Sequence, residues 1–150
     1  MKTFRFRLAT LLRLRNATRD QRRAQLAEAY RADDVVRQEQ QRLGQELACL
    51  KRRQRTASAP GEIDVDQLLA EQRYGLLLHG QQQHLDRQRQ LLAAEIERRR
   101  ALLVEADREV RVLEKLEQRQ RQRHLEEANR LDVRQLDEVA HRRALPEDAP

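Results

Sequence analysis

Residues 85–113, LDRQRQLLAAEIERRRALLVEADREVRVL, decide the fold of this chain. Apolar side chains recur in this stretch at intervals of three, four or seven residues. The set is Leu85, Leu92, Ile96, Leu103, Ala106, Val110 and Leu113. This spacing places the side chains on one stripe of an α-helix, which is the seam of a coiled coil. The pattern predicts long helices that contact other helices, and it gives little reason to expect a catalytic pocket.

The composition supports the helical prediction and leaves little material for a globular core. The chain has 150 residues, of which 37% are charged and 3% aromatic, and it contains no Trp. Large aromatic side chains supply much of the buried area in globular cores, so their scarcity counts against such a core. The abundant Ala, Glu, Arg, Gln and Leu residues favour helices, and the sustained leucine spacing argues against disorder.

One cluster of helix-breaking residues interrupts the helical pattern, at Thr56-Ala57-Ser58-Ala59-Pro60-Gly61. Pro60 disfavours helix at the residue before it, and Gly61 gives the backbone freedom to turn. Asp64 is the expected N-cap of the helix that follows, with Gln67 as its capping-box partner.

The cluster divides the chain into two helices. We expect a first helix at about 4–55, a turn at about 56–63, a second helix at about 64–143 and a frayed tail at 144–150. Two helices joined by a short loop normally pack antiparallel. The predicted fold is therefore all-α, a long antiparallel two-helix coiled-coil hairpin that forms a single domain over residues 1–150.

The first helix has its own apolar seam, and three arginines interrupt it. The seam consists of Leu8, Leu12, Leu26, Ala29, Val36, Leu43, Leu47 and Leu50. Arg15, Arg19 and Arg22 also occupy seam positions, which predicts a stretch that is loosely paired or that contacts an acidic group. Cys49 is the single cysteine, and we expect it to be a small buried side chain.

The second helix is predicted to be longer than the first, so part of it should lack a partner. Tight pairing from the turn outward would place Leu8 opposite about residue 110. Beyond Leu113 the heptad frame continues through mostly polar positions, Glu117, Gln120, His124, Glu127, Leu131 and Arg134. A helix that is polar on all sides is poorly stable alone and often requires a partner. A slipped pairing, in which residues 56–80 protrude at the turn, is the alternative.

Three consecutive leucines, Leu76-Leu77-Leu78, follow Tyr74 near the expected turn. Because successive side chains on a helix are about 100° apart, one or two of the leucines must point away from the seam. Either this segment forms a wider local core at the hairpin tip, or it forms a docking patch. The docking patch would consist of Tyr74, Leu77, Leu78 and Leu85.

The net charge of +6 is unevenly distributed, because residues 1–23 contain eight basic residues and Asp20 as their one acidic residue. This segment should prefer an anionic partner. A nucleic-acid-binding helical protein is one alternative, but no stacking aromatic residues are interleaved with the arginines, and the chain also carries 25 acidic residues. We therefore expect a protein partner and no nucleic acid.

The sequence offers no catalytic or metal-binding arrangement. Its four glycines form no phosphate-binding loop, and the five-residue separation of His79 and His84 is the wrong spacing for one helical face. We expect no enzyme activity, no catalytic residues, no cofactor, no metal and no small-molecule substrate. No stretch approaches the roughly 18 apolar residues of a transmembrane helix.

Both ends of the chain carry short motifs. The N-terminus reads Phe4-Arg5-Phe6-Arg7-Leu8-Ala9-Thr10-Leu11-Leu12, which has the form F-x-F-x-L-x-x-L-L. Toward the C-terminus, Leu113-Glu114-Lys115-Leu116 precedes Leu136-Asp137-Glu138-Val139-Ala140-His141-Arg142-Arg143, which has the form L-D-E-x-A-x-x-R. In this order, and at this chain length, the motifs resemble those of the FliJ family of flagellar export proteins.

The resemblance implies an antiparallel coiled coil similar to the central stalk of rotary ATPases. It implies docking into, and stimulation of, the hexameric flagellar export ATPase (FliI), with links to the export gate protein (FlhA) and to export chaperones. The implied location is cytoplasmic, peripheral at the cytoplasmic face of the inner membrane at the flagellar base. A related injectisome system, in place of the flagellar one, stays open.

The resemblance also implies two binding sites. The ATPase-binding residues would be Phe4, Phe6, Leu8, Leu11, Leu12, Arg13, Arg15, Leu136, Asp137 and Glu138. The gate-binding residues at the hairpin tip would be Tyr74, Leu77, Leu78 and Leu85. A hydrophobic clasp between the chain's own ends is the alternative for the first set, and both hold if the clasp is the docking surface. A generic structural coiled-coil scaffold that self-associates is the alternative function.

Overall fold

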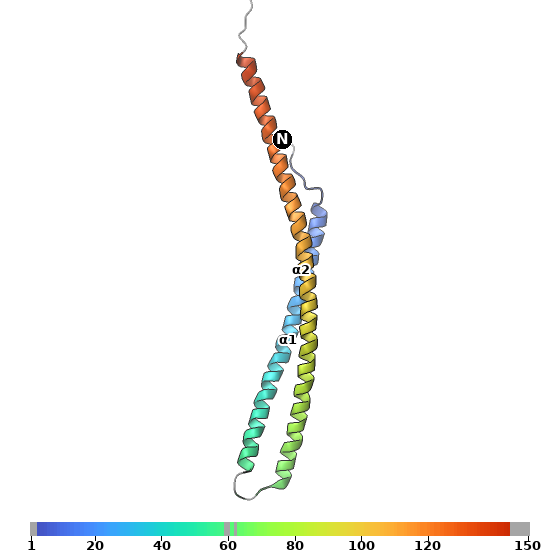
Figure 1. Ribbon diagram of the computed structural model, residues 1–150, viewed down its shortest axis with the longest axis vertical. Helices are drawn as coiled ribbons and strands as arrows, with labels where there is room; N and C mark the ends of the chain where they lie inside the picture. Colours follow the sequence, from blue (N-terminus) through green and yellow to red (C-terminus); the bar gives the residue numbers. More distant parts are fainter. Residues whose placement is uncertain (1–2, 59–60, 62, 145–150) are drawn as a thin grey trace, which may run out of the picture. The chain divides into compact units, whose positions relative to one another are not determined.

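The computed structural model describes residues 3–58, 61 and 63–144, and within them it contains two α-helices and no strand (Figure 1). Helix α1 spans Ala9–Ala57 and helix α2 spans Val65–Ala144. The two helices pack against each other, so the predicted all-α helical hairpin is confirmed. The expected tail at 145–150 and the predicted helix-breaking effect of Pro60 lie outside the described residues.

The helix ends agree with the sequence at the turn and differ from it at the N-terminus. Asp64 caps α2, because its Oδ1 accepts hydrogen bonds from the backbone N–H groups of Asp66 at 3.1 Å and Gln67 at 3.2 Å. The Gln67 side chain is directed to Glu71 and does not complete the expected capping box. At the other end, α1 begins at Ala9, five residues later than expected.

The chain consists of two compact units, and each is described by itself. We call Gln21–Val104 the hairpin unit. We call Met1–Asp20 together with Glu105–Pro150 the terminal unit. The expectation of a single coiled-coil domain over 1–150 stays a prediction.

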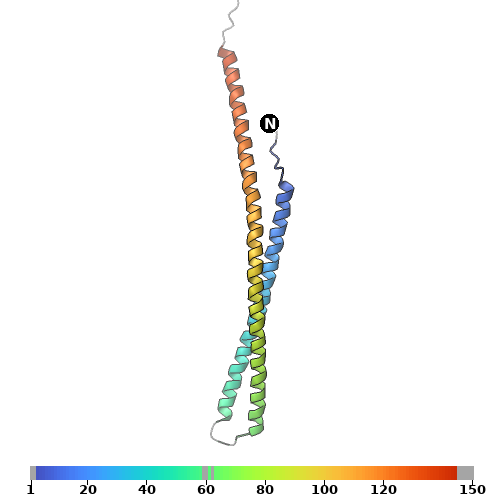
Figure 2. The same cartoon turned by 45° about the vertical axis from the view of Figure 1, so that its right-hand side comes forward.

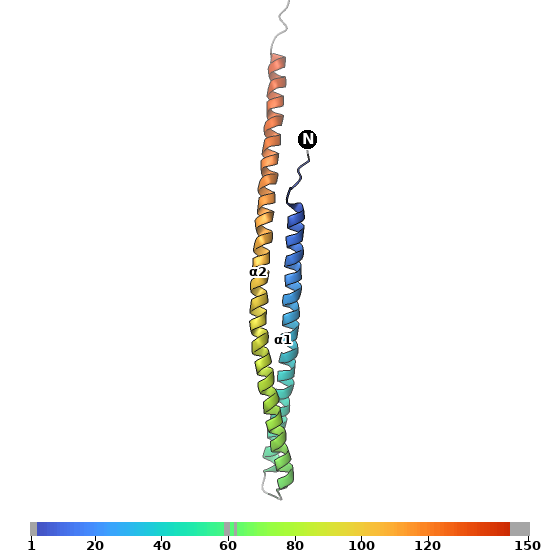
Figure 3. The same ribbon diagram turned by 90° about the vertical axis from the view of Figure 1, so that its right-hand side faces the viewer.

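In the hairpin unit, α1 and α2 run antiparallel and side by side (Figures 1 and 3). The Tyr74 hydroxyl donates a hydrogen bond to Glu46, at 3.3 Å. Farther from the turn, the Gln40 amide donates to Asp86 at 2.6 Å. Residue numbers therefore fall along α1 as they rise along α2. Leu78 packs beside the α1 leucines, so the alternative with residues 56–80 protruding is wrong.

The apolar core of the hairpin unit lies near the turn and follows the predicted seam. Its buried cluster consists of Leu43, Leu47, Leu50 and Leu78, with Leu85 packed against it. Ala29 and Ile96 are also buried. The prediction that Cys49 is buried was wrong, because it is exposed. The helix turns the positions at 43, 47 and 50 inward, and residue 49, about 100° before residue 50, points away.

In the terminal unit, the start of α1 packs against α2, and Arg15 forms an ion pair with Glu109 at 2.9 Å. Antiparallel counting from this pair places Leu8 opposite about residue 116. The expected position, about residue 110, was therefore wrong. Part of this shift arises because α1 ends two residues later, and α2 begins one residue later, than expected.

The α2 seam of the terminal unit changes from buried to exposed along its length. Ala106 and Val110 are buried, and Leu113, Glu117, Gln120 and His124 are half-buried. Residues 129–142 are all exposed. The expectation that the later part of α2 lacks a partner within the chain is therefore confirmed for the described residues.

Candidate interaction surfaces

The hairpin tip presents an apolar surface made by the leucine run. Leu78 is 2% exposed and belongs to the core, whereas Leu77 is 58% exposed and Leu76 is 74% exposed. Tyr74 is also exposed, and Leu85 is partly buried. One leucine therefore completes the core and two face outward, and the docking patch stays a prediction. As a gate-binding residue Leu78 was a wrong choice in this structure, because its side chain is covered.

The exposed leucines border two grooves between α1 and α2. The first groove is lined by Glu39, Arg42, Leu43, Glu46, Leu76, Leu77, Gly80, Gln81, His84 and Leu85. The second is lined by Leu47, Leu50, Lys51, Gln54, Gln72, Gly75, Leu76 and His79. Leu76 borders both grooves, and the sequence analysis missed it. The sequence does contain a signal for this exposed residue. The seven-residue seam spacing from Leu85 back to Leu78 places Leu78 in the core and therefore leaves Leu76 outside it.

Gly75 permits a close approach of the two helices at this surface. A Cβ atom at this position would lie 3.2 Å from Cδ2 of Leu50, which is tighter than ordinary van der Waals contact. The helices can therefore approach closely beside the second groove without displacing the Leu50 side chain.

The N-terminal segment of the terminal unit lies beside α2 (Figure 2). The rings of Phe4 and His124 are 5.8 Å apart, and Phe6 is 8% exposed. The Phe6 carbonyl accepts a hydrogen bond from the Ala9 N–H at the helix start. Residues 4–8 form a separate segment before α1, in which Phe4 packs on His124 and Phe6 is buried. The N-terminal segment thus packs on α2 near His124, and not on Leu136, Asp137 and Glu138, as a clasp between the two ends of the chain would require.

The predicted ATPase-binding residues fall into two groups. Phe4, Phe6 and Leu12 are at least half-buried against the rest of the unit, and Leu8 and Leu11 are moderately exposed. Arg13 is exposed, while Arg15 is half-buried with its ion pair to Glu109. Leu136 is 69% exposed, and the neighbouring Asp137 and Glu138 are exposed as well. Leu136, Asp137 and Glu138 thus lie on the part of α2 that has no covering helix within the described residues.

A groove in the terminal unit runs from Phe4 of the first group along α2 and ends at Gln135, just before the second group. Its lining residues are Phe4, His124, Leu125, Glu127, Ala128, Leu131, Asp132 and Gln135. It begins at the aromatic contact and continues along the exposed α2 seam. The N-terminal segment and the unpaired part of α2 therefore form one continuous surface.

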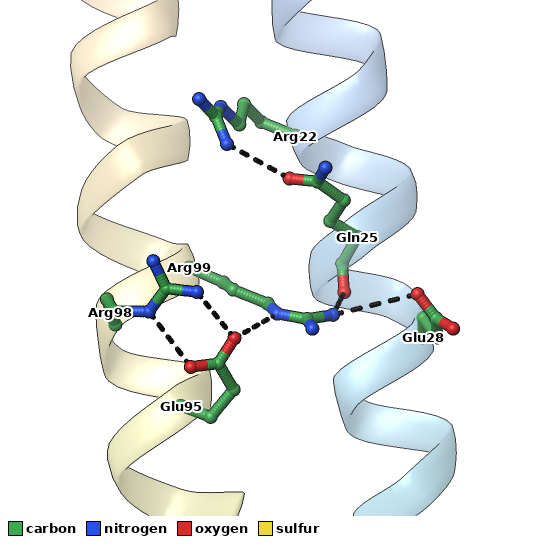
Figure 4. Close-up of polar contacts among 6 residues, drawn as sticks. All are labelled: Arg22, Gln25, Glu28, Glu95, Arg98 and Arg99. Carbon is green, nitrogen blue, oxygen red and sulfur yellow. Dashed lines mark hydrogen bonds and ion pairs between the residues drawn. The ribbon is translucent and has the colours of Figure 1, made fainter.

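Polar contacts link the helices at the end of the hairpin unit that lies away from the turn (Figure 4). The Arg99 guanidinium bonds to Glu95 on its own helix and reaches across to the Gln25 carbonyl oxygen and to Glu28 on α1. Arg98 also bonds to Glu95, at 2.8 Å and 2.9 Å. We call this group the Glu95 clamp. Of the seam arginines, Arg22 donates to the Gln25 side chain at 3.1 Å.

A buried carboxylate lies between the apolar tip core and the Glu95 clamp. Asp33 is buried, and its two oxygen atoms contact Arg37 at 2.9 Å and Arg89 at 3.7 Å. Arg89 also donates to the side chain of Gln40, which occupies the next polar seam position. These partners depend on the register of the two helices, which the heptad pattern leaves open.

The Glu95 carboxylate should titrate at unusually low pH. The hydrogen bonds from Arg98 and then Arg99 lower the pKa of Glu95 from its ordinary 4.5 to about 2. Because this pKa is lowered on folding, the stabilisation from the clamp is present above pH 4.5 and is lost as the pH falls toward 2. A carboxyl NMR titration of the full chain should show this shift. Replacement of both arginines by Ala should return the Glu95 pKa toward its ordinary value, and titration of Glu95 with the other exposed glutamates would contradict the clamp.

The described residues show neither a metal centre nor a membrane span. They contain no group of three or more His, Cys, Asp or Glu side chains arranged to hold a metal ion. None of the described helices is long and apolar enough to cross a bilayer. The exposed surfaces are therefore the features that carry functional information.

Within the described residues, the fold and these surfaces define a class of protein, a pair of packed helices with exposed apolar side chains. A family model described as Flagellar FliJ protein matches residues 4–147. The chain therefore belongs to the FliJ family and is a component of flagellar export. Members of this family are non-catalytic components of the export apparatus. No curated protein and no solved structure matches the chain.

Proposed function

We propose that the terminal unit docks into the hexameric export ATPase (FliI) and stimulates it, and that the hairpin tip contacts the export gate protein (FlhA). In this proposal the chain also handles export chaperones and works at the cytoplasmic face of the inner membrane. The exposed α2 stretch over residues 129–142 carries the proposal. The fourteen residues of this stretch are all exposed, and a helix without packing partners is marginal in water. Insertion into a partner would bury its apolar side chains.

The apolar residues of this stretch are unusually open for an otherwise polar helix. Leu131, Val133, Leu136 and Val139 are each about half exposed or more. Leu131 lines the groove that begins at Phe4, so a partner that covers the seam would meet the N-terminal segment at the same time. This continuity supports a single docking surface that uses both groups of predicted residues.

The tip surface supports the proposed gate contact. Leu76 and Leu77 are exposed between grooves, and the hairpin core beneath them is well packed. A partner helix or extended segment could cover these leucines without displacing the core. We therefore propose Tyr74, Leu76 and Leu77 as the gate contact, with Leu85 at its border.

The ATPase contact can be tested with the double substitution Leu136→Ala and Asp137→Ala. Both side chains are exposed, so the substitution should leave the helix content unchanged. Loss of a contact worth about 1 kcal/mol or more would raise the concentration for half-maximal ATPase stimulation roughly fivefold to tenfold. The measurement is ATP hydrolysis by the purified ATPase at increasing concentrations of the full chain.

Leu91→Ala is a suitable control, because Leu91 is exposed on α2 in the hairpin unit. It should leave the stimulation unchanged. Equal stimulation by the double variant and the unaltered chain, or loss of circular dichroism in the double variant, would contradict the docking surface. Concentration-dependent self-association without ATPase binding would favour the generic scaffold.

A further inference from the structure

Two short segments of the terminal unit carry an excess of positive charge, as does Lys51–Arg55 in the hairpin unit. Residues 3–13 contain three arginines and no acidic residue. Residues 115–125, which lie between Glu114 and Glu126, contain four basic residues and one acidic residue. Together the two segments account for the whole formal net charge of +6, because the remaining 24 basic and 24 acidic residues balance.

The fold brings these two segments together. The contact between Phe4 and His124, and the burial of Phe6, hold the N-terminal segment beside this part of α2. We call the resulting group of side chains the basic collar. It consists of Arg5, Arg7, Arg13, Lys115, Arg119, Arg121 and Arg123.

The charges of the basic collar are not neutralised within the described part of the chain. All seven side chains are exposed, and none forms an ion pair or hydrogen bond with another described residue. Neighbouring arginines differ, because Arg15 is paired with Glu109 and Arg111 with Asp107. A concentration of unpaired like charge repels itself and attracts an anionic surface.

The collar residues on α2 point to both sides of the helix pair. Gln120 and His124 are half-buried, so they mark the side of α2 that faces the rest of the unit. Arg121 lies about 200° around the helix from Arg119 and from Arg123. A flat membrane surface would reach one side and leave the other unpaired. A surface that encloses the helix pair would reach both.

Nucleic acid fits the collar less well than an acidic protein does. Binding of single strands relies on stacking of bases on exposed aromatic rings. The two aromatic residues here are engaged within the chain, because Phe6 is buried and Phe4 packs on His124. The collar therefore provides charge without a stacking platform.

We propose that the basic collar binds a surface rich in Asp and Glu that encloses the helix pair. This inference rests on the proposed function, in which the enclosing surface is the inner wall of the ATPase ring. It adds the chemistry of the contact, and it adds Arg119, Arg121 and Arg123 of α2, which lie outside the family motifs. The contact should weaken with salt, because exposed charge pairs are screened.

The test is the triple substitution Arg119→Gln, Arg121→Gln and Arg123→Gln in the full chain. A matched control is Lys51→Gln, Arg53→Gln and Arg55→Gln, which removes the same charge at the same spacing from exposed positions of α1. The dissociation constant for the purified ATPase hexamer is measured at low and moderate salt. The collar variant should bind roughly tenfold more weakly at low salt and show a flatter salt dependence, with unchanged circular dichroism. The control should match the unaltered chain.

The results that would contradict the inference can be told apart from those that would contradict the proposed function. If the unaltered chain does not bind the ATPase, the proposed function and the collar inference both fail. If it binds, and the collar variant has the same affinity and salt dependence, the collar inference alone fails. Collar-dependent binding to anionic lipid vesicles or to single-stranded RNA, with ATPase binding unaffected, would also overturn the inference.

Discussion

Val110→Asp is expected to detach the start of α1 from α2 in the terminal unit. Val110 is fully buried on the α2 seam, and the substitution would place a carboxylate where the valine methyl groups now pack. An uncompensated charge at a buried position costs about 3–5 kcal/mol. We expect lower helix content, faster proteolysis within residues 3–20 and loss of ATPase stimulation. Circular dichroism and limited proteolysis measure the first two effects.

Val112→Asp is the matched control for this experiment. Val112 lies two residues farther along the same helix and is 60% exposed, so the same change should alter the free energy of unfolding by no more than about 0.5 kcal/mol. Similar destabilisation by both variants would show that the effect comes from helix propensity. Unchanged proteolysis in the Val110 variant would contradict the packing described for the terminal unit.

Leu78→Ala is expected to destabilise the hairpin tip by about 2–4 kcal/mol. The side chain is buried among Leu43, Leu47 and Leu50, so its removal loses apolar burial and leaves a cavity. The effect should be largest near the turn. Hydrogen exchange of the amides in residues 43–50, together with urea unfolding followed by circular dichroism, provides the measurement.

Leu77→Ala, at the same surface, should weaken binding to a partner while leaving the stability of the hairpin tip almost unchanged. Leu77 is exposed, so the change in stability should be about 0.5 kcal/mol or less, while binding to the gate protein should weaken. The two neighbouring leucines thus separate packing from docking. Unaltered gate binding by Leu77→Ala would remove it from the proposed contact, and a small effect of Leu78→Ala on exchange would contradict the core.

The leucine spacing was sufficient to predict the hairpin and most of its seam. Ile96, Ala106 and Val110 are buried where the spacing placed them, because burial of an apolar stripe is what holds two such helices together. The breaker cluster located the turn to within a few residues of the observed helix ends, and the predicted N-cap at Asp64 is confirmed. The presence of an unpaired α2 stretch also followed from the pattern, but this stretch begins at about residue 129 and not directly after Leu113.

The sequence pattern could not predict the register of the two helices or the conformation of the N-terminal segment. A heptad repeat looks the same after a shift of seven residues, so the spacing alone could not pair Arg15 with Glu109. The first helix was expected to begin at about Phe4, but α1 begins at Ala9. Phe4 instead packs on His124, a contact that no local pattern could predict. The Glu95 clamp depends on long side chains that cross between helices, and no local signal predicts such contacts.

The contact between Phe4 and His124 also concerns the synthesis of the chain. These residues are 120 positions apart, and a ribosome delivers the N-terminal one first. The whole of α1 is therefore made before most of its partner helix exists, and the N-terminal segment can close only when translation has passed His124. Closure of this segment therefore requires a polypeptide that has been translated at least as far as His124. A chain that ended before Lys115 would present an open N-terminus and three of the seven residues of the basic collar.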